Sequence, residues 1–165
     1  MLAEISFYNV VLFIHITAVV LAFGVTFTYP LVFAAARRSH RRHLPFFHRI
    51  QHVIGQRMIA PMGGVILLAG LYLAIKGPYE FGDPWIGITL LILIVLLAAG
   101  GAYFSPREHR LADLAERDVA ASQGDGPVEF GAEYEGLYRQ VHTVALIGNA
   151  LVLLAIFLMV TKPGA

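Results

Sequence analysis

Apolar residues dominate four long stretches of this sequence, and polar residues gather in the connections between them. A helix needs roughly twenty apolar residues to cross the hydrocarbon core of a bilayer, and four segments meet that requirement. The pattern therefore predicts an all-α fold, a four-helix transmembrane bundle that forms a single domain over residues 1–165. The helices are expected at about residues 5–36, 53–76, 85–104 and 139–161.

The composition agrees with a membrane protein. Hydrophobic residues make up 58% of the chain and charged residues 14%, with a mean hydropathy of +0.69. This leaves too little polar surface for a water-soluble globule of this length, so we expect membrane lipid, and no nucleic acid, as a partner. The chain has no cysteine, which excludes disulfides, thiolate metal sites and cysteine nucleophiles.

The arginines are concentrated in one connection. Five of them lie between Arg37 and Arg49, directly after the first apolar stretch, and such basic connections stay in the cytoplasm. Alternation then predicts that both termini lie outside, in a multi-pass protein of the bacterial cytoplasmic (inner) membrane. His40, His43 and His48 alternate with these arginines, and we expect them on a solvated face that meets anionic lipids.

The connection between the third and fourth helices has a helical pattern of its own. Ser105, Pro106 and Glu108 match an N-cap, a first helical residue and a capping-box partner. Apolar residues then recur at helical spacing, which predicts a short cytoplasmic amphipathic helix over about residues 106–122. The turn residues 124–127, GDGP, should end this helix.

Polar and ionisable side chains inside the membrane are the candidates for chemistry, because they are costly there and tend to mark functional sites. The helical rise places His15 roughly 10 Å below the outer face. We therefore expect a partner for its imidazole: a cofactor, Asn149, or a main-chain carbonyl across the bundle. The candidate cofactor-binding residues are His15, His52, Arg57, His142 and Asn149, with His15 and His142 as candidate metal ligands.

Haem ligation by two histidines requires imidazoles at similar depth on facing helices. His52 and His142 meet the depth condition near the inner face, whereas His15 lies roughly 20 Å away along the membrane normal. One haem is therefore the most that the chain could ligate in this way. His52 and His142 could instead bond a loop carbonyl or meet lipid headgroups, and Arg57 could extend to the inner interface or pair with a propionate.

Two segments carry a family resemblance. The first helix has His15 nine residues before Gly24 in the stretch LFIHITAVVLAFGVTFTYPLV, and the last helix ends LVLLAIFLMVTKPG. These segments resemble an uncharacterised family of four-helix bacterial integral membrane proteins, a domain of unknown function (number 2269). That family is distantly similar to the membrane protoporphyrinogen oxidases of bacteria and to the copper-resistance D proteins, whose helices contain LHxxAxxxxxG. The resemblance implies a haem, porphyrin or metal contact for His15.

The leading hypothesis is a small integral membrane protein that binds a haem or porphyrin in redox or tetrapyrrole metabolism, through His15 or through His52 and His142. The alternative is a non-enzymatic membrane component: a small transporter, a copper-handling protein or a structural subunit of a larger complex. Small residues let helices approach closely, so glycines in the second and third helices predict a homo-oligomer or a partner membrane subunit. These glycines are Gly63, Gly64, Gly70, Gly100 and Gly101.

Overall fold

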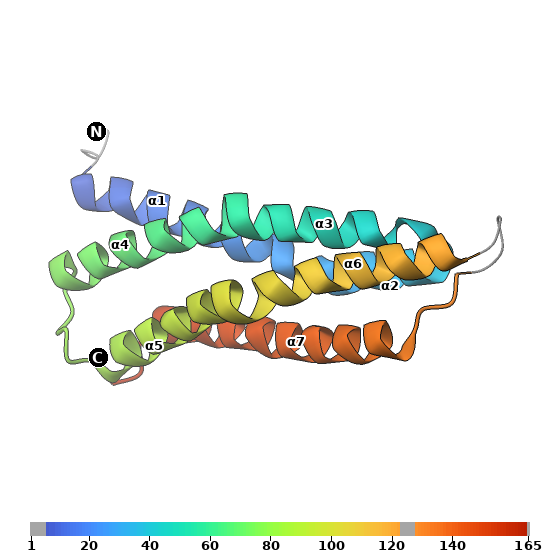
Figure 1. Cartoon of the computed structure of the whole chain (residues 1–165). Coiled ribbons are helices and arrows are strands. Elements are labelled where there is room, and N and C mark those ends of the chain that lie inside the picture. Colours follow the sequence, from blue (N-terminus) through green and yellow to red (C-terminus); the bar gives the residue numbers. More distant parts are fainter. Residues whose placement is uncertain (1–5, 123–127, 165) are drawn as a thin grey trace.

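Helices are the only regular elements in residues 6–122 and 128–164, which are the residues that the computed structural model describes. They join into four long helices, each with a stretch long and apolar enough to cross a membrane (Figure 1). This confirms the all-α fold with four candidate spans. The spans are Phe7–Ser39, Arg41–Lys76, Pro84–Ala121 and Ala132–Thr161. Their elements are α1 (Phe7–Gly24), the 3-10 helix η1 (Val25–Phe27), α2 (Tyr29–Ser39), the 3-10 helix η2 (Arg41–His43), α3 (Leu44–Ile54), the π-helix η3 (Gly55–Ile59), α4 (Ala60–Lys76), α5 (Pro84–Ala98), the π-helix η4 (Ala99–Phe104), α6 (Ser105–Ala121) and α7 (Ala132–Thr161).

The second, third and fourth spans are longer than the hydropathy pattern predicted, whereas the first nearly matches its expected length. The first three spans contain 33, 36 and 38 residues, which is about 50 to 57 Å at 1.5 Å per residue, whereas the hydrocarbon core is about 30 Å thick. The bundle therefore has an apolar end, formed by α1, α4, α5 and the second half of α7, and a charged end, formed by α2, α3, α6 and the first turns of α7. In Figure 1, α1 begins and α7 ends at the same end of the bundle as the connection 77–83.

The arginine-rich stretch is helical rather than an extended loop. The chain breaks its helical course at His40, with φ −137° and ψ 41°, and resumes it at Arg41, well before the start predicted near residue 53. Leu44 and His48 are buried in α3, which packs against α6. A buried face of this kind holds a helix together even where its other face carries charge.

The helix predicted over residues 106–122 does not stand alone. The chain passes from α5 through η4 into α6 without a break, and Ser105 has the helical angles φ −52° and ψ −52°. Ser105 is therefore not an N-cap, which corrects the capping assignment. Proline cannot donate the main-chain hydrogen bond of a regular helix, and the π-helical turn just before Pro106 accommodates that loss. The turn predicted at residues 124–127 lies outside the described residues.

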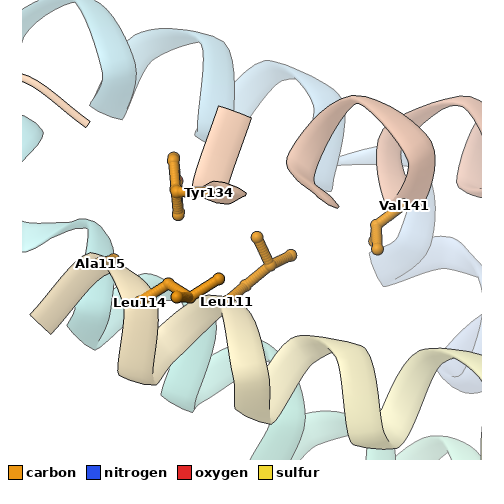
Figure 2. Close-up of a cluster of buried hydrophobic side chains, with 5 residues drawn as sticks. All are labelled: Leu111, Leu114, Ala115, Tyr134 and Val141. Carbon is orange, nitrogen blue, oxygen red and sulfur yellow. The ribbon is translucent and has the colours of Figure 1, made fainter. Parts of the chain in front are cut away.

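The core of the charged end joins α6 to α7. Figure 2 shows the side chains of Leu111, Leu114 and Ala115 on α6 facing Tyr134 and Val141 on α7, and all five are buried. Tyr134 is fully buried, so its ring provides the largest apolar surface of this cluster. The cluster fixes the two helices at the end of the bundle that carries the charge.

At the apolar end the four helices form two close pairs. α1 packs mainly on α4, around Ala18, Ala22 and Ile66, and α5 packs mainly on α7. Small residues in α1 permit this close approach. Large apolar side chains such as Leu68 (71% exposed) and Val160 (75% exposed) point away from the bundle, as expected for surfaces that face lipid.

Candidate functional site

His15 of α1 lies at the apolar end of the bundle. Its side chain is half-buried, and its Nδ1 atom lies 3.1 Å from the main-chain oxygen of Ile66 on α4. Because a carbonyl can only accept a hydrogen bond, Nδ1 carries the proton and Nε2 keeps its lone pair. A main-chain carbonyl across the bundle was one of the partners expected for His15.

Gly70 makes room for the His15 ring. A Cβ atom added at Gly70 would lie 3.0 Å from Cε1 of His15 and 3.4 Å from its Nδ1 atom. Gly70 follows Ile66 by one helical turn on α4, so the carbonyl that orients the imidazole and the glycine that admits it belong to the same face. Two residues of α4 thus fix the position and the tautomer of His15.

His15 lines a cavity of about 370 Å³ between the helices of the apolar end. Known small-molecule sites span roughly 300 to 1,000 Å³ and are mostly apolar with a few polar groups. The walls of this cavity follow that description: all four spans contribute to it, and most lining residues are apolar. Its lining includes His15, Val19, Ile66, Gly70, Trp85, Ile92, Val152 and Ala155.

A polar pair lies among the lining residues near the end of the bundle. Lys162 donates a hydrogen bond from Nζ to the hydroxyl of Tyr79 over 2.6 Å, and both residues line the cavity. Lys162 is the residue directly after α7 and has a left-handed conformation with φ 46°. Its main-chain N–H donates a hydrogen bond to the Leu158 carbonyl. The same cavity therefore holds an imidazole among its apolar walls and a cation near the helix end.

Asn149 has a different partner from His15. Its Oδ1 atom accepts a hydrogen bond from the Thr26 hydroxyl over 2.8 Å, and its Nδ2 atom donates to the Thr26 carbonyl over 3.3 Å. Thr26 lies in η1, where the first span changes from α to 3-10 geometry. Asn149 therefore binds α7 to the interruption of the first span and does not contribute to the His15 cavity.

The remaining predicted residues, His52, Arg57 and His142, lie towards the charged end and have no contact in common. His52 of α3 faces His109 of α6, with ring centres 5.9 Å apart, whereas His142 of α7 stacks on Tyr138 at 5.7 Å. Arg57 is exposed in η3 and has no hydrogen bond or ion pair with the described residues. Within residues 6–122 and 128–164, no group of three or more His, Asp or Glu side chains is placed to hold a metal ion. The structure does not gather the five predicted residues into one site.

His48 is a buried residue that sequence reasoning placed in solvent. It is 1% exposed, and its Nε2 atom lies 2.9 Å from the hydroxyl of Tyr134 on α7. Its Nδ1 atom is buried without a hydrogen-bond partner. The signal for burial was its spacing, because His48 follows the buried Leu44 by four residues and thus shares its helix face.

Glu108 is a second buried polar residue, and it is not the exposed capping-box partner that the sequence suggested. Its side chain is 7% exposed and hydrogen-bonded to Gln51 of α3. Glu108 precedes the buried Leu111 by three residues and Ala112 by four, so it lies on the face of α6 that packs inward. An acidic residue in register with an apolar stripe was the signal that could have identified it.

One family of known proteins matches most of this chain. No curated protein and no solved structure matches this chain. The sequence profile of the family described as predicted integral membrane protein (DUF2269) matches residues 9–163, which is nearly the whole chain. The two other families named above as distantly similar are not among the matches. With four candidate spans and a match of this extent, the chain belongs to this family of predicted integral membrane proteins of unknown function.

Proposed function

We propose that the cavity at the apolar end binds a haem or porphyrin, and that His15 would hold a haem iron through Nε2. The observation that carries the proposal is the hydrogen bond from Nδ1 of His15 to the Ile66 carbonyl. Metal-ligating histidines commonly donate their other ring N–H to such a carbonyl, which fixes the tautomer and orients the ring. Imidazole is also a common axial ligand of haem iron.

The cavity fits a flat apolar ligand with a charged edge. Its volume of about 370 Å³ is near the lower end of known small-molecule sites, so one edge of a macrocycle would remain in contact with lipid. The apolar walls would cover the ring, while Lys162 and Tyr79 lie where carboxylate groups need donors. A bound haem would supply a redox-active iron. Within the described residues, His15 is the one histidine that lines this cavity.

Titration with ferric protoporphyrin tests this proposal and separates the histidines. The chain purified in mild detergent should develop a Soret band of ligated haem, and His15→Ala should abolish or shift that band. His52→Ala and His142→Ala should keep it, because neither residue lines the cavity. A band lost in the His52 and His142 variants but kept in His15→Ala would contradict the assignment.

The same titration addresses the other class of function. A small transporter, a copper-handling protein or a structural subunit would remain fully helical and bind no porphyrin. In that case the His15 hydrogen bond would serve helix packing between α1 and α4. A colourless, folded sample that does not respond to ferric protoporphyrin would therefore favour a non-enzymatic membrane component.

The charged end supports an orientation in a bacterial cytoplasmic membrane. Its arginines would face the cytoplasm, so the start of α1 and the end of α7 would lie on the outer side with the connection 77–83. Self-association is a second part of this proposal. Gly64, Gly100 and Gly101 have no side chain of the described residues near the position of an added Cβ atom, and such open glycines suit contact with another helix.

A further inference from the structure

A recess of about 390 Å³ lies between α2 and α7, where the apolar part of the bundle meets the charged end. We propose that it binds a phosphate group, either in the headgroup of an anionic phospholipid or as a free phosphate. This site is separate from the His15 cavity and does not depend on haem binding. Its lining residues are Pro30, Leu31, Ala34, Arg37, Arg38, Arg41, Tyr138 and His142.

Arg37 is held in the recess by two neighbours on α7. Its Nη2 atom donates to both carboxylate oxygens of Glu135, over 2.9 Å and 2.7 Å, and its guanidinium lies 4.3 Å from the ring centre of Tyr138. The Nη1 atom of the same guanidinium is buried and has no hydrogen-bond partner in residues 6–122 and 128–164. A buried N–H without an acceptor is unfavourable, so this rigidly held group would gain from an anionic acceptor.

Arg41 has a similar free donor, and Arg38 adds an exposed charge. Nη1 of Arg41 donates to the Val128 carbonyl over 2.9 Å, whereas its Nε atom is buried without a hydrogen-bond partner among the described residues. Arg38 has no hydrogen bond or ion pair with the described residues. Glu135 compensates one of these three guanidinium charges, which leaves an excess of positive charge. The guanidinium fork suits phosphate oxygens particularly well.

The apolar wall of the recess favours a lipid as the source of the phosphate. Leu31, Ala34 and Arg38 follow one another at spacings of three and four residues, so they lie along one face of α2. Leu31 is 74% exposed, and its side chain continues the lipid-facing surface of the first span. A phospholipid with its phosphate at the arginines could lay an acyl chain along this face.

Native mass spectrometry of the full chain tests the site. The protein would be mixed in detergent with dioleoyl phosphatidylglycerol, with zwitterionic dioleoyl phosphatidylcholine, or with inorganic phosphate. We expect one retained phosphatidylglycerol and at least about tenfold weaker binding in the double variant Arg38→Gln, Arg41→Gln, since each lost charge-assisted hydrogen bond is worth about that factor. Arg37 stays unchanged because its ion pair with Glu135 supports the fold.

The matched control removes two arginines elsewhere at the charged end. The double variant Arg49→Gln, Arg110→Gln changes net charge equally but leaves the recess intact, because these arginines pair with Glu116 and Glu133 instead. It should retain the lipid as the parent does. Binding of inorganic phosphate without lipid, lost in the recess variant alone, would support the site with free phosphate as its ligand. Equal binding in both double variants, with circular dichroism showing both folded, would overturn the proposal.

Discussion

The imidazole of His15 and the main-chain oxygen of Ile66 join α1 to α4 across 3.1 Å inside the apolar end of the bundle. Gly70 admits the ring beside them, and a methyl group there would meet Cε1 of His15 at 3.0 Å. Gly70→Ala should therefore displace the imidazole and weaken porphyrin binding by about tenfold, equivalent to about 1.4 kcal/mol. Titration with ferric protoporphyrin in detergent measures this effect.

Gly64→Ala is the matched control for that substitution. It lies on the same helix, and nothing in the described residues lies within 4 Å of its added Cβ atom. Both changes raise helix propensity by about 1 kcal/mol, but only Gly70→Ala brings a methyl group against the His15 ring. Equal affinities for the two alanine variants would show that the position of the His15 ring does not control binding.

Thr26 and Asn149 should stabilise each other. Asn149→Leu removes both hydrogen bonds between η1 and α7, whereas Thr26→Val removes only the one from its hydroxyl to Oδ1, because the main-chain carbonyl at position 26 remains. Hydrogen bonds inside membrane proteins average about 0.6 kcal/mol and reach about 1.7 kcal/mol. A double-mutant cycle, followed by chemical denaturation in detergent, should give a coupling free energy in this range. Thr161→Val removes a hydroxyl that bonds within its own helix, and it should show no coupling to Asn149.

Glu108→Gln should not destabilise the charged end. The carboxyl group is buried, and burial of an ionised carboxylate is costly unless its charge is compensated. The amide has the same shape and can keep the hydrogen bond with Gln51, so the free energy of unfolding should rise by about 1 kcal/mol. Glu116→Gln, on the exposed surface, should change it by less than about 1 kcal/mol. A marked loss of stability in Glu108→Gln would indicate that the ionised carboxylate has a required partner.

The orientation can be measured by cysteine labelling, since the chain has no cysteine of its own. Gly82→Cys lies in the connection at the apolar end, and Ala120→Cys lies at the exposed end of α6. A membrane-impermeant maleimide should label Gly82→Cys in intact bacterial cells and Ala120→Cys only after the membrane is opened. The opposite pattern would place the arginines outside.

The four spans could be predicted from the sequence because the requirement for length and apolar composition is strict. The continuation of the second span beyond the bilayer could not be predicted, because the stretch from Arg37 to Arg49 was interpreted as a loop from its charge alone. A helix that continues into water is held by its buried face, and Leu44 and His48 carry that face here. A search for long apolar stretches does not detect a buried helix face as short as this one.

The candidate site was only partly predictable for a related reason. The sequence showed that His15 belongs to a long apolar stretch, and from this we expected a partner for its imidazole. The identity of that partner, the Ile66 carbonyl, depends on how α1 and α4 pack, and main-chain acceptors leave no mark in the sequence. Depth alone likewise grouped His52 with His142, although the His52 ring contacts His109 of α6 and the His142 ring stacks on Tyr138 of its own helix.

The central claim, that His15 ligates a haem iron, can be measured by rescue of a His15 variant with free imidazole. His15→Gly would open a space beside Gly70, and imidazole added to the solution could occupy it as an exchangeable ligand. If His15 ligates the iron, the Soret band of ferric protoporphyrin bound to this variant should differ from the parent band and return to it when imidazole is added. A parent-like band in His15→Gly without imidazole would contradict ligation by His15.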